Sequence, residues 1–522
     1  MHENRETSSL AASQRSSPAG KGRSRTAGMN GGEESDGVEV PMKLANKAKE
    51  KQAGVAEQGE GRTPTEENIG QRSTRPAQEG RGVSQGLAGV RKVARERKQE
   101  RFTTLLHHLT IDLLRASFYA LKKSAAPGVD GVRWQEYEDG LEDRLADLKD
   151  RIHRGAYRAQ PSRRIYIPKV DGRQRPIGIA ALEDKIVQQA VGTILNEVYE
   201  VDFRGFSYGF RPGRNPHQAL DALSVGIERK RVNWILDADI RGFFDQMSHE
   251  WTMKFVRHRI ADPRILRLIQ KWLQAGVSED GEWSETKGGT PQGAVISPLL
   301  ANVYLHHVFD LWLEAWREKV AKGDVIAIRY ADDLVVGFEN RAEAERFVKE
   351  FQKRWGKFGL ELHPEKTRLI EFGRFARAKR QARGEGEPES FTFLGFTHRC
   401  GTNRAGKFTI WRQTVRKRLE AKLQQVKQEL RARMHEPVPA VGEWLGQVLN
   451  GFYQYYAVPG NQNSLHRFRS RIVSYWKHVL ARRSQRGRLK AGRMSRFCER
   501  WLPSPRVVHP YPSVRFAARH PR

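Results

Sequence analysis

The sequence predicts a mixed α/β fold that is followed by an all-α region and preceded by a disordered leader. Between residues 101 and 400, short apolar runs alternate with amphipathic helical segments. Beyond residue 400, long segments combine helical periodicity with an excess of basic residues, whereas the first hundred residues have no such periodicity. Because hydrophobic periodicity is the main sequence signal of secondary structure, we place boundaries at 1–100, 101–400, 401–502 and 503–522.

The composition points to a nucleic-acid partner. The chain has 522 residues and a formal net charge of +31, and a charge this large is expected to attract a polyanion. No apolar run is long enough for a transmembrane helix, and no signal-like segment follows the N-terminus. We therefore expect a soluble, cytoplasmic protein that does not bind a membrane. Two cysteines, Cys400 and Cys498, are too few for a zinc finger or a disulfide framework.

The charge is concentrated at the C-terminal end. Residues 401–522 contain 26 Lys or Arg, five Glu and no Asp, which is an excess of 21. About two thirds of the total excess thus lies in the last 122 residues. We expect the polyanion to bind there.

The first hundred residues read as a disordered leader. They are rich in Gly, Ser, Arg, Glu and Gln and nearly free of aromatic residues, a composition that cannot bury enough apolar surface to fold. A charged helix is possible around Val90 to Phe102.

The globular pattern begins with a helix and a hairpin. Leucines recur at helical spacing between Leu105 and Leu114, and a turn follows at 126–132. The segment RRIYIPKVDGRQRP is a hairpin signal with its turn at Asp171–Gly172. A helix with one continuous apolar face follows over residues 182–200.

The second half of the α/β region contains further strands and helices. We predict a strand in NWILDADIRGFFD (233–245), a helix over 249–260, and a Gly/Pro turn that leads into a long helix over 288–316. The segment IAIRYADDLVVGF (326–338) is predicted as a hairpin that bends at Ala331–Asp333. A helix from Ala342 to Phe358 and one strand, FTFLGFTH (391–398), complete this region.

The adjacent aspartates at the bend require an explanation. Two like charges a few ångströms apart raise each other's pKa, and burial raises it further, unless a cation lies between them. At a tight bend both side chains can approach one ion, and DADIRGFFD supplies a further carboxylate at the end of a predicted strand. Oxygen ligands favour Mg²⁺, and two such ions between carboxylates and substrate phosphates promote phosphoryl transfer.

Several motifs together resemble the reverse transcriptases that bacterial group II introns encode. They are RRIYIPKVDGRQRPIGI, SYGFRPGRNPHQAL, DIRGFFD, GGTPQGAVISPLLANVYL and YADD, in that order along the chain. The resemblance extends from about Leu105 to Arg522, and LNGFYQYYAVPGN resembles the maturase signature. It implies a right-hand polymerase with fingers and palm over 101–400 and an all-α thumb, or maturase (X) domain, over 401–502.

The resemblance also assigns the metal site. It implies that Asp239 and Asp332 are the metal-binding pair, with Asp333 as the third carboxylate, and it adds Ile240 to the metal ligands of two Mg²⁺ ions. Asp237 lies two residues before Asp239 and shares its strand face, so it remains the alternative to Asp239.

Further residues are assigned to the incoming dNTP. Phe244 falls where related polymerases place an aromatic ring beneath the sugar, which excludes a 2′-hydroxyl. One of Phe243 and Phe244 is expected to be only a core residue, and strand alternation favours Phe243 for that place. Lys169 and Arg175 flank the hairpin turn and could neutralise the triphosphate. Gln292 resembles the residue that lies against nucleotide and template.

Four arginines are candidates for nucleic-acid contacts. Arg211 and Arg214 in SYGFRPGR are expected to bind template or primer phosphates, with a purely structural turn as the alternative. Arg482 and Arg483 belong to a basic run that would contact the intron RNA. Backbone contacts of this kind position a folded RNA by shape without reading its sequence.

Three functional hypotheses follow. In the first, the chain is an RNA-directed DNA polymerase in a bacterial ribonucleoprotein, with RNA template, DNA primer, target DNA and dNTPs as partners. It is also a maturase that binds the intron RNA to assist splicing and mobility. In the second, it is an RNA-binding splicing factor with a residual polymerase. The third is a host-defence reverse transcriptase, against which the maturase signature argues. The intact candidate residues favour the first.

The tail over 503–522 carries a separate expectation. It contains no Asp and no Cys, so it lacks the ligands of an HNH endonuclease. We expect insertion without cleavage of the second strand, and a tail that either touches DNA or forms an extended cap on the thumb.

Overall fold

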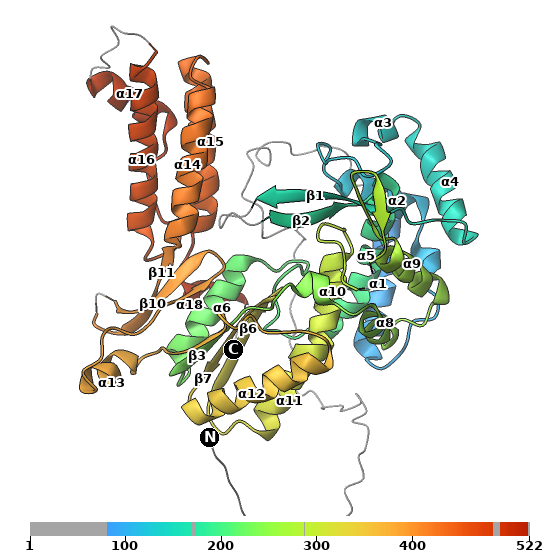
Figure 1. Cartoon of the computed structure of the whole chain (residues 1–522), viewed down its shortest axis with the longest axis horizontal. Coiled ribbons are helices and arrows are strands. Elements are labelled where there is room, and N and C mark those ends of the chain that lie inside the picture. The colour runs from blue at the N-terminus through green and yellow to red at the C-terminus, as the bar shows by residue number, and fades with distance from the viewer. Residues whose placement is uncertain (1–80, 169–173, 287, 404, 484–490, 520–522) are drawn as a thin grey trace, which may run out of the picture. The chain divides into compact units, whose positions relative to one another are not determined.

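The computed structural model describes residues 81–519 apart from 169–173, 287, 404 and 484–490. Most of the predicted leader, the hairpin turn at Asp171–Gly172 and Lys169 lie outside the described residues. Within them, the mixed α/β region and the helical region that follows both match the expectation (Figure 1).

The N-terminal helices pack around one long helix, α5 (Leu182–Asp202), as predicted from its apolar face. They are α1 (Arg81–Glu96), α2 (Ile111–Ala120), α3 (Trp134–Glu138) and α4 (Leu141–His153). The last part of the predicted leader is therefore folded. Leu87, Val90 and Ala94 are buried on one face of α1, and Arg91 pairs with Glu197 of α5. The buried face of α1 therefore packs against the core next to α5.

The first sheet has the strand order β2–β1–β4–β5. The predicted hairpin is formed by β1 (Ser162–Pro168) and β2 (Gln174–Ile179), which pair antiparallel from Arg163–Ile179 to Pro168–Gln174. The short strands β4 (Val277–Glu279) and β5 (Glu282–Ser284) continue the sheet on the side of β1. Helices α8 (His249–Arg257) and α9 (Pro263–Gln274) lie between these segments in sequence.

The central sheet has the order β6–β7–β3–β8 and is antiparallel throughout. Its strands are β3 (Trp234–Ala238), β6 (Val325–Tyr330), β7 (Asp333–Phe338) and β8 (Arg368–Glu371). Helix α12 (Arg341–Lys357) packs against β3 and β7, and α6 (Pro216–Arg229) packs against β6. The predicted long helix is interrupted: α10 (Ser297–Leu305) and α11 (Leu311–Lys319) are joined by a π-helical turn, His306–Asp310.

The third sheet corrects two predictions. The expected strand 391–398 is a hairpin of β9 (Phe391–Phe393) and β10 (Phe396–Thr402), and β11 (Phe408–Thr414) completes the order β11–β10–β9. The turn residues Leu394 and Gly395 both have positive φ, 46° and 79°. Leucine rarely adopts this conformation, so the sequence contains no strong turn signal here. Residues 401–402 and 408–414 thus belong to a sheet, and the first helix after it begins at Arg416.

The C-terminal helices form their own apolar core. They are α14 (Arg416–Ala432), α15 (Val438–Tyr456), α16 (Gln462–Ala481) and α17 (Ala491–Trp501). Trp501 lies directly over Gly442 and Gly446 of α15, where a Cβ atom would clash with its ring or carbonyl. Small residues therefore permit the close approach of α15 and α17.

The tail matches the expected extended cap only in part, and its contact with DNA stays a prediction. After a non-helical stretch it contains a helix, α18 (Pro512–Arg519), which packs on α6. Arg515 pairs with the buried Asp221 of α6, and Val508 N–H donates to Ala457 O at 2.9 Å. Within the described residues, no helix is both long and apolar enough to cross a membrane.

Candidate active site

The register of the central sheet brings two predicted carboxylates together. Ala238 of β3 pairs with Leu334 of β7, so Asp239 follows directly at the end where β7 begins. Tyr330 pairs with Asp333, which leaves Ala331 and Asp332 as a two-residue turn. Asp239 and Asp332 therefore share one edge of the sheet, although they are 93 positions apart in the printed sequence.

The electrostatics of this pair favour a cation. Burial raises the pKa of the Asp332 carboxyl and the charge of Asp239 raises it further, while Arg175 and Arg329 oppose the shift. Lys366 Nζ donates to Asp239 Oδ2 at 2.5 Å. The Lys366 side chain is 51% exposed, so this cation neutralises Asp239 from the solvent side.

Asp239 and Asp332 fit a Mg²⁺ site, whereas Asp333 does not join them in the cluster of three carboxylates that the sequence predicts. Among the described residues, no three His, Cys, Asp or Glu side chains gather closely enough to hold a metal ion, so Asp333, which is exposed at the start of β7, does not complete a preformed cluster. Mg²⁺ is usually held by one or two carboxylates together with substrate phosphates. The pair of Asp239 and Asp332 meets that description, whereas the roles of Asp333 and Ile240 stay predictions.

Asp237 has a partner of its own. It lies within β3, opposite Arg368 of β8, and its carboxylate is 3.6 Å from the Arg368 guanidinium. Burial raises the pKa of Asp237 to about 6 against the effect of Arg368. This ion pair gives Asp237 a structural role, and Asp239 keeps the position nearer the turn.

Two residues assigned to the nucleotide contact each other. Arg175 of β2 donates from Nε to Gln292 Oε1 at 2.7 Å, and its charge acts on Asp332. The loop that carries Gln292 is held against β2, because Gly178 N–H donates to Gln292 O at 2.8 Å. A Cβ atom at Gly293 would lie 2.7 Å from Gly178 O, so glycine is required for this approach. Arg175 and Gln292 are thus held together at a place from which the charge of Arg175 reaches Asp332.

Phe243 and Phe244 lie in a short helix, α7 (Phe243–Gln246), instead of continuing the strand. The strand alternation that separated a core residue from a substrate-facing one therefore does not apply. Both rings are buried, with 2% and 9% exposure. Phe244 O accepts from Thr290 N–H at 2.8 Å, which places Phe244 beside the loop of Gln292.

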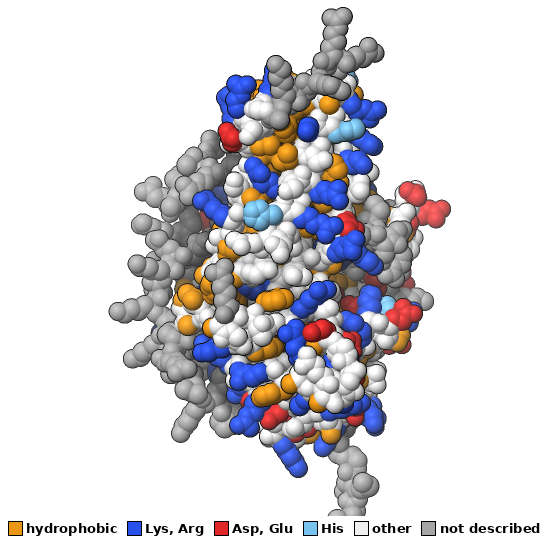
Figure 2. Space-filling model, turned by 90° about the vertical axis from the view of Figure 1, so that its left-hand side faces the viewer, with side chains coloured by type: hydrophobic (Ala, Val, Ile, Leu, Met, Phe, Trp, Pro, Cys, Tyr) orange, Lys and Arg blue, Asp and Glu red, His pale blue; other side chains and the backbone are white. Residues whose placement is uncertain are grey.

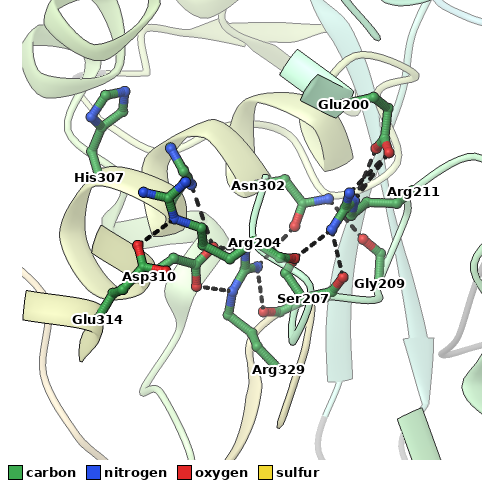
Figure 3. A network of polar contacts seen from close by, with 12 residues as sticks. Glu200, Arg204, Ser207, Gly209, Arg211, Asn302, His307, Asp310, Glu314 and Arg329 are labelled. Carbon is green, nitrogen blue, oxygen red and sulfur yellow. Dashed lines mark hydrogen bonds and ion pairs between the residues drawn. The ribbon is translucent and has the colours of Figure 1, made fainter. Parts of the chain in front are cut away.

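Arg211 is not a phosphate ligand in this structure. Its side chain is 3% exposed and pairs with Glu200 of α5 at 2.9 Å, and it donates to the carbonyls of Arg204 and Ser207, each at 2.7 Å (Figure 3). All the donors of a buried guanidinium must be satisfied inside the protein, and here they hold the SYGFRPG loop.

The other predicted nucleic-acid contacts are at the surface or beside a pocket. Arg214 lies 5.2 Å from the Tyr208 ring centroid and lines a pocket together with Gln218, Arg515 and Phe516. Arg482 is exposed directly after α16 and Arg483 is half-buried. Their contacts with nucleic acid stay predictions.

Sequence reasoning missed four residues around the two aspartates: Lys366, Arg329, Asp310 and Asn302. Asp310 and Arg329 are charges inside otherwise apolar runs, YLHHVFDLWL and VIAIRY. A charge in such a run must be paired if the run is buried, and that signal could have identified the pair.

Comparison with known proteins agrees with the arrangement. Residues 167–398 match the family model described as reverse transcriptase (RNA-dependent DNA polymerase). The chain is 34% identical over 280 residues to protein YkfC of Escherichia coli K12, which covers 48% of this chain and 73% of that protein. It is 34% identical over 224 residues to the group II intron-encoded protein LtrA of Lactococcus lactis subsp. cremoris, covering 42% and 37%. To nuclear intron maturase 3, mitochondrial, of Arabidopsis thaliana it is 26% identical over 217 residues, covering 36% and 30%. The chain thus spans most of the first relative and about a third of each of the other two.

Proposed function

The chain belongs to the family of reverse transcriptases and maturases that group II introns encode, and from this premise we propose that it copies RNA into DNA and binds an intron RNA. The partners would be RNA template, DNA primer, target DNA, dNTPs and the intron RNA itself. In this proposal the first sheet with α1–α5 forms the fingers, the central sheet forms the palm, and α14–α17 form the thumb and maturase domain.

The observation that carries the polymerase proposal is the convergence of Asp239, Asp332, Arg175 and Gln292. Asp239 and Asp332, with Asp333, would hold two Mg²⁺ ions, which supply neutralisation of the phosphate charge in nucleotidyl transfer. Arg175 offers a planar fork of donors to a triphosphate, and its bond to Gln292 Oε1 orients both side chains. Phe244 would lie beneath the sugar of the incoming nucleotide.

The maturase role is a second function of the same chain, and a separate observation favours it. Helices α14–α17 have their own apolar core, while residues 401–522 have an excess of 21 positive charges. On the face in Figure 2, Lys and Arg side chains are spread over the surface with few acidic ones between them. Such a surface binds the backbone of a folded RNA.

Asparagine substitutions test the polymerase proposal. Asp239→Asn and Asp332→Asn each remove an anionic ligand but keep the size of the side chain, so we expect primer extension on an RNA template to be lost while RNA binding is retained. Asp237→Asn is the matched control, because its carboxylate faces Arg368, and it should extend primers at close to the wild-type rate. Loss of extension in Asp237→Asn with normal extension in Asp239→Asn would reverse the assignment.

A further inference from the structure

Arg329 has a guanidinium that is completely buried beside the catalytic turn. It lies on β6, three residues before Asp332, and is 0% exposed. Its Nε and Nη2 donate to both oxygens of Asp310 at 2.8 and 2.6 Å. Its Nη1 donates to Asn302 Oδ1 at 2.9 Å and to Ala331 O at 3.3 Å (Figure 3). Four donated bonds thus connect one side chain to a helix, a π-helical turn and the catalytic turn.

The counter-ion is equally buried. Asp310 ends the π-helical turn and is 0% exposed. Burial alone would raise the pKa of its carboxyl, but the Arg329 charge and His306 outweigh it and hold the pKa below its usual value. A buried ion pair seldom adds net stability compared with apolar residues of similar size. The pair is therefore better explained by the geometry that it imposes than by stability.

Asn302 extends the contact to the SYGFRPG loop. Its side chain is 1% exposed and donates from Nδ2 to Gly209 O at 2.7 Å. A Cβ atom at Gly209 would lie 2.2 Å from Ala331 N, so the loop backbone rests directly on the catalytic turn. The loop also pairs with β6, since Tyr208 N–H donates to Arg329 O at 2.8 Å.

The turn that these contacts surround is strained. Ala331 has φ of +54°, a conformation that costs a residue with a Cβ atom of order 1 kcal/mol or more and persists only where surrounding contacts enforce it. Arg329 bonds the carbonyl of this residue, and Gly209 covers its amide. The direction of the next side chain, Asp332, follows from the Ala331 conformation.

We propose that Arg329 is a positioning residue for nucleotidyl transfer: with Asp310 as counter-ion and Asn302 as bridge, it holds Ala331 in the left-handed conformation that aims Asp332 at the reaction site. The proposal rests on the proposed polymerase activity. It assigns the buried polar residues of three motifs, SYGFRPG, ANVYLHHVFD and RYADD, to one support beneath the turn. The shape of the guanidinium, more than its charge, performs this role.

Arg329→Lys tests the proposal because lysine keeps the charge but cannot make the forked contacts. We expect kcat for nucleotide addition to fall by about 10- to 100-fold, as displacement of a reacting group by about 1 Å does. The KM for dNTP and the affinity for primer–template should stay within a factor of about two of wild type, because the buried Arg329 is not among the residues proposed to touch the nucleotide or the nucleic acid. Arg412→Lys is the matched control: Arg412 is also buried and pairs with Asp221 at 3.0 Å, but it lies on β11, away from the turn.

Rescue by glycine separates positioning from general structural support. Glycine adopts positive φ without strain, so Ala331→Gly should remove the need for enforcement. Arg329→Lys lowers kcat by some factor in the wild-type background. In the Ala331→Gly background we expect that factor to be at least five times smaller. Asn302→Ala in both backgrounds provides the same test without disturbing a buried charge, in case Arg329→Lys does not fold.

The outcomes are distinguishable. If the wild-type protein does not extend primers, the proposed function fails. If wild type is active and folded Arg329→Lys keeps its kcat, the positioning role is wrong while the polymerase stands. The same conclusion follows if Arg329→Lys lowers kcat by the same factor in the wild-type and Ala331→Gly backgrounds. If Arg329→Lys does not fold, the factor for Asn302→Ala is compared in the same way.

Discussion

Arg211 and Arg329 illustrate how misleading single basic residues are in a chain with a net charge of +31. Arg211 is part of a motif with a nucleic-acid resemblance, yet its guanidinium pairs with Glu200 and two carbonyls. Arg329 lies in an apolar strand, and its guanidinium donates to Ala331 O in the turn that carries Asp332. Sequence type alone does not distinguish a phosphate ligand from a buried anchor. The distinguishing property is whether the donors are already satisfied within the protein.

Sugar selection is predicted to depend on Phe244. Phe244→Val should open space beneath the ribose and raise ribonucleotide incorporation relative to wild type by about ten- to a hundredfold, the usual range for steric exclusion of one group. Valine retains part of the packing of this buried ring. The measurement is the ratio of rNTP to dNTP incorporation in primer extension.

Phe243→Val provides the control for Phe244→Val. Its ring is also buried and packs on Tyr304, with centroids 6.2 Å apart, so this variant should lose stability without a change in selectivity. If selectivity changes in Phe243→Val and not in Phe244→Val, the sugar gate belongs to the other ring.

At the scale of elements, the sequence predicts what depends on local pattern and misses what depends on tertiary contact. Helix α5 and the hairpin of β6 and β7 follow from periodicity and are confirmed. The turn at Leu394–Gly395 was missed because leucine does not signal positive φ. The candidate site shows the same division. Motifs predicted that Asp239 and Asp332 lie together, and the register places them at one edge of the sheet. Lys366 reaches Asp239 from a distant loop that no local pattern connects to it.

Asp184 joins three elements and should make their stability depend on pH. It lies in the first turn of α5 and accepts hydrogen bonds from Tyr157 Oη and, at 2.9 Å, from Gln160 N–H, while Trp272 of α9 donates to Tyr157 Oη at 2.9 Å. Burial raises the pKa of Asp184 from 3.8 to about 6 against these hydrogen bonds. The folded state therefore binds the proton more tightly than the unfolded state does. With respect to this group, stability is highest below about pH 4 and falls as the pH rises to 6, by about 3 kcal/mol.

Asp184→Asn tests this pH dependence. Asparagine keeps one acceptor and cannot ionise, so the free energy of unfolding of wild type minus that of the variant should fall by about 2.4 kcal/mol between pH 4 and pH 7. Urea unfolding at a series of pH values measures the difference, in which the contribution of Asp237 cancels. A difference that stays constant or rises with pH would contradict the assignment.

Across the whole molecule, the excess of positive charge is partly used for folding. Arg412 of β11 and Arg515 of α18 both pair with Asp221 of α6. The tail that follows the C-terminal helices is therefore attached to the α/β region through α6. Other cations of this region pair locally, as Arg433 does with Glu429. The basic residues beyond such pairs are the candidates for RNA contact. In the run after α16 these are the exposed Arg482 and the half-buried Arg483, whose contacts stay predictions.

Charge reversal at this run is predicted to weaken RNA binding without unfolding the protein. Arg482→Glu combined with Arg483→Glu should lower the affinity for the intron RNA, and the slope of log K against log salt concentration should become shallower by about 1.4 to 1.8 if both residues contact phosphates. Primer extension on an unstructured template should decrease less than splicing assistance, because the aspartates and the nucleotide site are unchanged. The matched control is Lys349→Glu with Lys353→Glu, which makes the same change of charge at exposed positions of α12, beside the central sheet. If both double variants reduce the affinity equally, the effect reflects net charge alone. If Arg482→Glu with Arg483→Glu binds RNA and assists splicing like wild type, the run after α16 is a solvated surface. The RNA site must then lie elsewhere on α14–α17.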